Sequence, residues 1–374
     1  MRGDIVSTET VNKSRFPELD FLRAVAVIAV IAIHVTSITL IKTDPDHFTR
    51  LSSLLINQLS RFCVPAFLFV SGILAYHSFH RSTYSQLIVS KVKALIIPYV
   101  VWTLIGLLFF LSFSINYKGI IMIFLTGNGP FYQLYYIPLL FQMFVILPLI
   151  MRFMLNRFIL IVISLLSCFL FIGYQFMIIE SVHTMSLIGY VSSFLQSAFF
   201  GWIIYFYIGL LAAKNYPSVL KFLQSKSLAF FVMIYVICSI LLVTDAYYSI
   251  IIHKQDELMG YFRISVLVYS FAALGLIIKL GMISKWKIMT NLYQNSFGIY
   301  LIHVAVLKLM FLISSVLFSN LIYVTASIVL TIVISYWIVE LIKRTPLSFL
   351  LLGQKSMSTK RHSSMKPRDK KMVS

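Results

Sequence analysis

Charged residues are scarce in this chain. Of its 374 residues 11% are Asp, Glu, Lys or Arg, whereas 60% are hydrophobic, and the mean hydropathy is +0.92. A water-soluble domain carries about 25% charged residues, because its surface must stay hydrated. The composition therefore argues against a soluble globular protein and predicts an integral membrane protein.

Cysteines are few, and the common cofactor motifs are missing. Cys63, Cys168 and Cys238 lie in apolar runs without the spacing of a zinc site or a disulfide framework. The chain has no Walker A loop, no dinucleotide-binding glycine pattern and no HExxH sequence. We therefore expect no metal site and no bound cofactor, and no transport driven by ATP hydrolysis in this chain alone.

Long apolar runs are abundant instead. About ten have the length of a membrane-spanning helix. They lie near residues 19–41, 57–79, 94–115, 133–152, 158–178, 194–213, 228–247, 260–279, 296–316 and 321–342. We therefore expect an all-α integral membrane protein with about ten transmembrane helices.

The regions outside these runs are short and polar. The start of the chain lacks a short apolar core followed by a cleavage site, so the first apolar run is expected to stay in the protein. We predict a cytoplasmic segment at 1–18, a transmembrane domain at 19–342 and a basic, disordered cytoplasmic tail at 343–374.

Basic residues far outnumber acidic ones, 31 to 12, and they are unevenly distributed. Sorted by predicted loop, 23 lysines and arginines fall on one side of the membrane and four on the other. The positive-inside rule then predicts that both termini are cytoplasmic. The basic tail is expected to lie near anionic lipids. It carries no interleaved aromatic residues, so we expect no nucleic-acid partner.

Few ionisable residues fall inside the predicted spans, and the first span carries three of them. The stretch "LDFLRAVAVIAVIAIHV" (19–35) contains Asp20, Arg23 and His34. Eleven helical steps place Arg23 and His34 on one face, about 16 Å apart. Intramembrane charges usually face a cavity or a partner, so we expect a cationic site near the cytoplasm and an imidazole deeper in, with Asp20 able to pair with Arg23. The spacing alone also allows Arg23 to snorkel and His34 to bond a neighbouring helix.

These residues carry a resemblance to a known family. "RFPELDFLRAVAVIAVIAIHV" (15–35) resembles the first helix of the membrane-bound acyltransferase-3 family, whose signature of Arg, ten residues and His is matched by Arg23 and His34. Later stretches resemble further family motifs in the family's order. They are "VPAFLFVSGIL" (64–74, with Ser71 and Gly72), "SKVKALIIPYV" (90–100, with Lys91 and Lys93), "FYIGLLAAK" (206–214) and "SFGIYLIHVAVL" (296–307, with Tyr300 and His303).

The resemblance covers nearly the whole chain, with some departures. Phe21 stands where the family often has Gly, and Lys91 and Lys93 stand where Arg is usual. Lysine lacks the planar fork of arginine, so this departure bears on the affinity for the donor and on its identity. The segment 199–223 resembles the branch of poly-N-acetylglucosamine exporters that have also been argued to be succinyltransferases.

The resemblance implies an acyltransferase of the bacterial plasma membrane. Its co-substrate would be a cytoplasmic acyl-CoA, and its acceptor a hydroxyl of a cell-surface glycan or glycolipid. His34 would act as a general base or as a transient acyl carrier. Arg23, Lys91 and Lys93 would bind the phosphates of the donor.

The other candidate residues lie on later predicted helices. We expect Ser71 to serve helix packing rather than as a nucleophile, and Glu340 to pair with Lys343 or Arg344. His303, one turn after Tyr300, is predicted about 10 Å from the cytoplasmic face and His34 about 10 Å from the outer face, so the two need not touch, and His303 could be a structural histidine. Arg61 and Arg263 lie near the predicted outer surface, where they could bind an anionic acceptor or snorkel.

Two other functions compete with acyl transfer. The chain could export a surface polysaccharide, although a transporter is expected to show inverted repeats with broken helices, which the sequence does not display. A non-catalytic scaffold in a glycan-assembly complex is disfavoured by the ionisable residues inside the spans.

Overall fold

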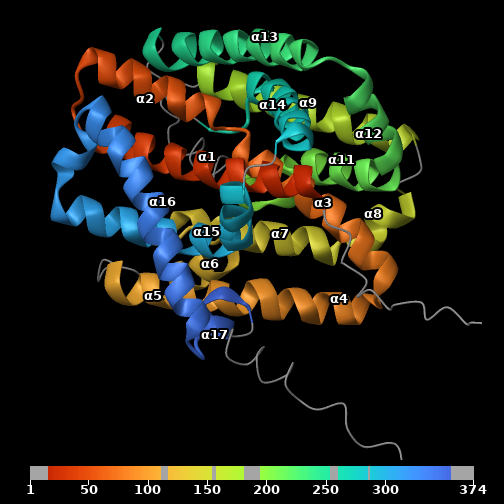
Figure 1. Cartoon of the computed structure of the whole chain (residues 1–374), viewed down its shortest axis with the longest axis horizontal. Coiled ribbons are helices and arrows are strands. Elements are labelled where there is room, and N and C mark those ends of the chain that lie inside the picture. Colours follow the sequence, from red (N-terminus) through yellow and green to blue (C-terminus); the bar gives the residue numbers. More distant parts are fainter. Residues whose placement is uncertain are drawn as a thin grey trace, which may run out of the picture.

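The computed structural model describes residues 16–110, 117–153, 157–180, 194–252, 260–284 and 287–354. Within these ranges every regular element is a helix (Figure 1), as predicted. The longer α-helices are α1 (Pro17–Lys42), α2 (His47–Leu59), α3 (Cys63–Arg81), α5 (Ile97–Phe110), α9 (Arg157–Glu180), α11 (Ile203–Lys214), α13 (Leu228–Ala246), α14 (Ile264–Ile283), α15 (Lys287–Ile313) and α16 (Leu321–Arg344). Shorter ones are α4 (Tyr84–Lys91), α6 (Tyr117–Thr126), α7 (Tyr136–Val145), α8 (Leu147–Phe153), α12 (Tyr216–Ser225) and α17 (Ser348–Leu352).

The number of clear membrane spans is smaller than the sequence predicted. In the described ranges seven helical segments are long and apolar enough to cross a membrane, or eight if the bent pair Tyr132–Val145 and Leu147–Phe153 is one span. That pair bends by 52° next to Pro148, which cannot donate a helical hydrogen bond. Helix α9 itself has 24 residues, whereas α11 has 12 and is shorter than a full span. The described residues thus show seven or eight of the about ten predicted spans.

Helix α1 lies at the centre of the bundle. It packs against α2, α3, α14, α15 and α16, and Figure 1 shows it crossing the middle of the molecule. Its apolar side chains are buried on several sides, as expected for a helix that is hydrophobic all round. Arg23 and His34 are consequently placed inside the bundle rather than on its surface.

Both ends of the described chain lie at the same end of the bundle. Arg23, near the start of α1, lines one cavity together with Gly353 and Gln354, the last described residues. At the opposite end of α1, Lys42 lies 5.6 Å from the ring of Phe311, near the end of α15. This arrangement agrees with termini on one side of a membrane. That this side is the cytoplasm stays a prediction.

Part of the segment predicted to be a disordered tail is folded. Helix α16 continues to Arg344, and α17 follows at Ser348–Leu352. The indole Nε1 of Trp102, on α5, donates a hydrogen bond to the carbonyl of Leu351 at 2.9 Å. The folded domain therefore extends to Gln354, and the remainder of the predicted tail lies outside the described residues.

Two of the motif stretches meet where α3 crosses α11. A Cβ placed on Gly72 would lie 2.2 Å from the carbonyl oxygen of Phe206, and one on Gly209 would lie 2.2 Å from that of Phe69. Only glycine permits this approach of two backbones, which is a common way for membrane helices to associate. The stretch 64–74 on α3 and the stretch 206–214 on α11 thus pack directly against each other.

We predict that Gly72→Ala destabilises the protein by about 1–3 kcal/mol, as overpacking of a tight core does, because α3 and α11 must move apart. Gly173→Ala is the matched control, since a Cβ there has no atom within 4 Å. Thermal unfolding of both variants in detergent is the measurement. Equal melting temperatures for the two would contradict the close backbone contact.

Candidate active site

Two cavities of about 260 Å³ each lie along α1. One is lined by Arg23 and is called the Arg23 cavity; the other is lined by His34 and is called the His34 cavity. The eleven helical steps from Arg23 to His34 make about three turns of one continuous helix, so the two side chains lie at different depths of the bundle. Arg23 and His34, whose spacing places them on one face of α1, thus each line a cavity along that helix.

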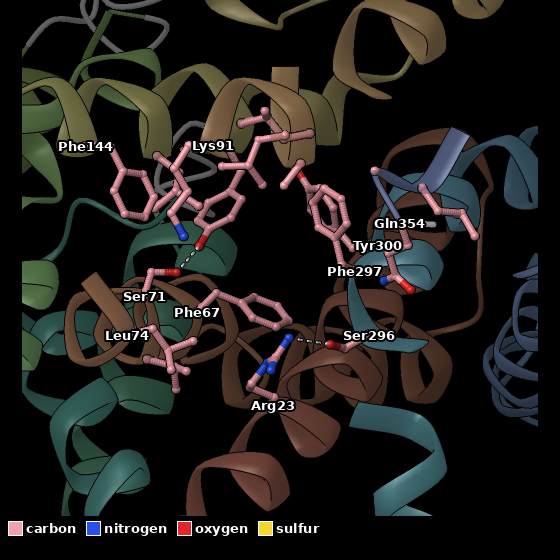
Figure 2. A pocket seen from close by; sticks show the side chains of 18 residues that line it. Arg23, Phe67, Ser71, Leu74, Lys91, Phe144, Ser296, Phe297, Tyr300 and Gln354 are labelled. Atoms are coloured by element: carbon pink, nitrogen blue, oxygen red, sulfur yellow. Dashed lines mark hydrogen bonds between the residues drawn. The ribbon is translucent and has the colours of Figure 1, made fainter. Parts of the chain in front are cut away.

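The Arg23 cavity brings together cations and hydroxyl groups from five helices. Arg23 donates to Ser296 Oγ of α15 at 3.3 Å, and Ser71 Oγ of α3 lies 3.4 Å from the hydroxyl of Tyr136 of α7. Lys91, at the end of α4, places its ammonium 4.4 Å from the ring centroid of Phe144. Figure 2 shows Arg23 and Lys91 pointing into the cavity from opposite walls.

Lys91 and Lys93 do not serve the same cavity. Lys91 lines the Arg23 cavity, whereas Lys93 lines a neighbouring surface groove that shares Ala94 and Gly353 with it. The two lysines belong to different helical elements, because α4 ends at Lys91 and a π-helix follows at Val92–Ile96. Such π-helical turns often mark functional sites. The two lysines therefore place positive charge in both the surface groove and the adjoining Arg23 cavity.

The His34 cavity is lined mainly by aromatic and basic side chains. His34 is accompanied by Arg61, at the junction of α2 and α3, and by Lys42. The ring of Tyr132 meets the imidazole of His34 edge-on, with the centroids 5.0 Å apart. The cavity thus combines one imidazole with two cations and a set of tyrosine rings.

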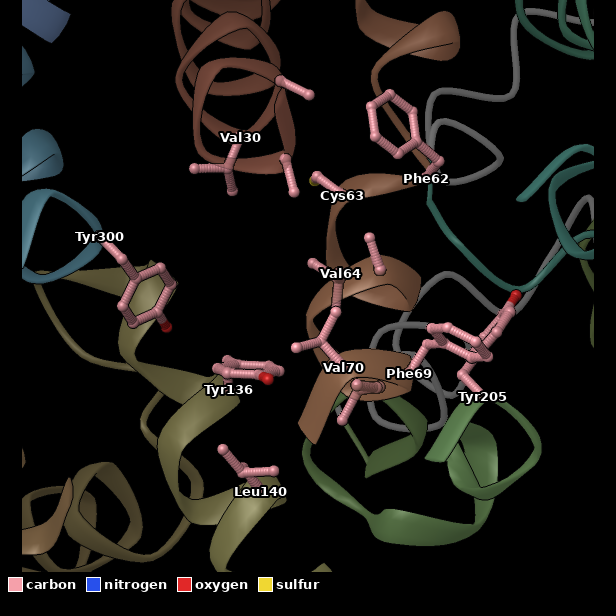
Figure 3. Close-up of a cluster of buried hydrophobic side chains, with 14 of the residues drawn as sticks. Val30, Phe62, Cys63, Val64, Phe69, Val70, Tyr136, Leu140, Tyr205 and Tyr300 are labelled. Atoms are coloured by element: carbon pink, nitrogen blue, oxygen red, sulfur yellow. The ribbon is translucent and has the colours of Figure 1, made fainter. Parts of the chain in front are cut away.

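Tyr136 and Tyr300 line both cavities. Their rings meet edge-on with the centroids 5.7 Å apart, and Figure 3 shows them side by side. The hydroxyl of Tyr300 donates to the carbonyl of Gln133, which fixes the ring. The two tyrosines therefore form the partition between the Arg23 cavity and the His34 cavity.

His34 and His303 face each other, a contact that the sequence prediction did not require. Their ring centroids are 5.1 Å apart. The prediction started the helix of His303 near residue 296, but α15 begins at Lys287. His34 lies 17 residues after the start of α1 and His303 lies 16 residues after the start of α15, so both are about 25 Å along helices whose first residues lie at the same end of the bundle.

The two histidines have different surroundings. His34 is partly exposed and lines its cavity, whereas His303 is fully buried behind it. The Nδ1 of His303 lies 3.1 Å from the carbonyl of Ile299, an acceptor, so this nitrogen carries the hydrogen. Its Nε2 is buried and has no hydrogen-bond partner among the described residues. His34 is therefore the histidine that a substrate can reach, and His303 supports it from behind.

Two of the candidate residues lie outside both cavities. Glu340 forms an ion pair with Lys343 at 3.2 Å and accepts a hydrogen bond from Asn295 at 2.9 Å. Asp20 lies one turn before Arg23 on α1 and is not among the residues that line the Arg23 cavity. Glu340 thus has the structural role expected for it, and neither carboxylate contributes to the lining of the Arg23 cavity.

Sequence reasoning missed the tyrosines of α7 and of the turn before it. Tyr132, Tyr135 and Tyr136 all line the His34 cavity. Three tyrosines within "FYQLYY" (131–136) interrupt an otherwise apolar run. Aromatic side chains with a polar tip are unusual in such density inside a span, and that pattern was the available signal.

The fold and the paired cavities define a class: a helical membrane protein with a pair of facing histidines inside the bundle and a cationic cavity at one end. The sequence profile described as an acyltransferase domain, of the acyltransferase-3 type, matches residues 16–340. The chain therefore belongs to the acyltransferase-3 family, as the motifs of α1, α3 and α15 predicted. With its spanning helices and bacterial relatives, it is a multi-pass protein of the bacterial cell membrane.

Among curated proteins the chain is similar to three from Staphylococcus aureus strains Mu50, MSSA476 and MRSA252. Each is named "Probable poly-beta-1,6-N-acetyl-D-glucosamine export protein" and is 27% identical, over 81% of this chain and 85% of the relative. No solved structure matches the chain significantly.

Proposed function

We propose that the protein transfers an acyl group from acyl-CoA to a hydroxyl of a cell-surface or lipid-linked glycan. One observation carries the proposal: cations line the Arg23 cavity, an imidazole lines the His34 cavity, and Tyr136 and Tyr300 line both. Acyl-CoA has anionic phosphates at one end and a thioester at the other, so its phosphates would lie near the cations and its thioester would reach toward the imidazole. The family membership supports the reaction class.

The donor would approach from the end of the bundle that holds Arg23. The Lys93 groove and the Arg23 cavity adjoin each other, so the nucleotide phosphates would lie near Lys93 and Lys91 while the pantetheine arm extends inward. The positive-inside rule assigns this end to the cytoplasm, where acyl-CoA is available. The donor thioester must then pass Tyr136 and Tyr300 to reach His34.

At His34 the reaction needs a base for the acceptor hydroxyl. Neutral imidazole would take the hydroxyl proton as the oxygen attacks the thioester carbonyl. The carbon–sulfur bond then breaks, the ester forms, and the proton passes to the departing CoA thiolate. In the alternative route His34 first carries the acyl group itself and then passes it to the hydroxyl.

The direct test uses purified protein in nanodiscs with labelled acetyl-CoA and a β-1,6-linked N-acetylglucosamine oligosaccharide, chosen from the names of the relatives. Release of CoA together with labelled ester on the oligosaccharide is expected. Movement of unmodified oligosaccharide across the membrane, with no CoA release for any acyl donor, would contradict the proposal.

Polysaccharide export is the second candidate, because the relatives carry that name and because cavities lie on both sides of the tyrosine partition. Export predicts oligosaccharide uptake into inverted vesicles without acyl-CoA. It also predicts that His34→Ala leaves this movement intact, whereas acyl transfer requires the imidazole.

His303 is a positioning residue in this scheme. His303→Ala removes the ring behind His34 and should lower turnover about tenfold to a hundredfold, the range found when the outer-shell partners of functional histidines are lost. His303→Gln keeps a polar group of similar reach and should restore part of the rate. The pH dependence of turnover should shift in both variants, since the neighbour of the imidazole has changed. Unaltered turnover and pH profile in His303→Ala would contradict the role.

A further inference from the structure

Arg61 is a buried cation in the wall of the His34 cavity. It lies between α2 and α3, and the whole residue is 6% exposed. Its Nη2 donates to Asn57 Oδ1 at 2.6 Å, and its guanidinium carbon lies 4.9 Å from the ring centroid of Tyr261. Its Nε is buried without a hydrogen-bond acceptor among the described residues. The guanidinium is therefore held in place by Asn57 and Tyr261, while its Nε–H group has no acceptor among the described residues.

Asn57 fixes Arg61 relative to α1. The Nδ2 of Asn57 donates to the carbonyl of Ile33 at 3.2 Å and to the hydroxyls of Thr36 and Ser37 at 3.1 and 3.0 Å. These three residues flank His34 in the sequence. The side-chain amide of Asn57 thus connects the guanidinium of Arg61, through hydrogen bonds, to the turn of α1 that carries His34.

Arg263 provides an internal comparison, because it is also buried and its Nε likewise has no acceptor among the described residues, but its charge is balanced. Its Nη1 lies 2.8 Å from Asp245 Oδ2, and its Nη2 donates to Gln58. For Arg61, in contrast, the described residues offer no carboxylate within ion-pair distance. A buried charge without a partner is strongly unfavourable. Lys42 adds a second cation to the same cavity wall.

We propose that Arg61 binds a carboxylate that enters the His34 cavity as part of a substrate. A guanidinium suits this task because its planar fork matches a carboxylate. The carboxylate has two possible sources: the far end of a dicarboxylic acyl group, or an acidic sugar of the acceptor. The inference deepens the proposed function by naming a charged substrate, but binding itself needs no acyl transfer.

The test measures ligand binding to purified protein in nanodiscs at constant ionic strength, with succinate and glucuronate as probes and succinamide and glucose as neutral counterparts. Succinate represents the acyl source and glucuronate the sugar source. We expect at least one anion to bind and its neutral counterpart not to. Arg61→Gln should raise the dissociation constant about tenfold or more, as loss of a hydrogen bond to a charged group does.

Arg50→Gln is the matched control, because Arg50 is half-exposed, does not line the His34 cavity and lies 3.6 Å from Asp44. If Arg61→Gln does not fold, Arg61→Lys keeps the charge without the fork and should still weaken binding. Binding of succinate alone identifies the acyl group as the source, and binding of glucuronate alone identifies the sugar. Failure of both anions to bind, or equal affinity in wild type and Arg61 variants, would overturn the inference. A protein that binds anions but never transfers an acyl group would instead overturn only the proposed function.

Discussion

His34→Ala should lower the turnover of acyl transfer about 10²- to 10⁴-fold, the range typical for loss of a general base. The reason is its position: His34 lines a cavity from a central helix, and its ring is braced by Tyr132 and His303. The defect should persist at saturating acyl-CoA, because in the proposed scheme the phosphates of the donor bind in the Arg23 cavity. Initial rates against acyl-CoA concentration in nanodiscs provide the measurement.

His80→Ala serves as the control for this experiment. His80 is exposed near the end of α3, where its Nδ1 lies 2.9 Å from the carbonyl of Tyr76. It should leave turnover unchanged, and both variants should elute as folded protein. Wild-type turnover in folded His34→Ala would rule out the catalytic role and favour polysaccharide export.

Arg23→Ala should weaken the binding of acyl-CoA about tenfold to a hundredfold, as expected when a hydrogen bond to a charged group is lost. Arg23 is partly buried in the cationic cavity and is oriented by Ser296 of α15. Arg23→Lys should be less harmful, because lysine keeps the charge but not the planar fork. The effect should appear in the donor KM, with turnover at saturation largely retained.

Arg81→Ala is the matched control for Arg23. Arg81 is exposed at the last turn of α3, at the same end of the bundle, and does not line the Arg23 cavity. Its loss should leave the donor KM near the wild-type value. If Arg23→Ala lowered turnover but left the KM unchanged, the donor-binding role would be wrong.

The sequence by itself determined the helical class and the elements that carry the site. Scarce charge and long apolar runs indicate membrane helices because unpaired polar groups are unfavourable in lipid. The spacing of Arg23 and His34 determined their common helix face, since an α-helix has a fixed period. The Ser-Gly stretch at Ser71 and Gly72 also pointed to close helix packing, and the structure shows its helix in contact with the helix of Gly209.

Only the tertiary structure decided how these elements meet. Apolar runs mark helix ends poorly in a membrane, because a helix such as α15 can extend into polar sequence without loss of backbone hydrogen bonding. Its early start at Lys287 brings His303 against His34, a contact that counting from the predicted boundary did not predict. The tyrosine partition and the unbalanced charge of Arg61 likewise depend on contacts between residues far apart in the chain. Periodicity determines which face of a helix is polar, but the neighbour of that face is set by packing.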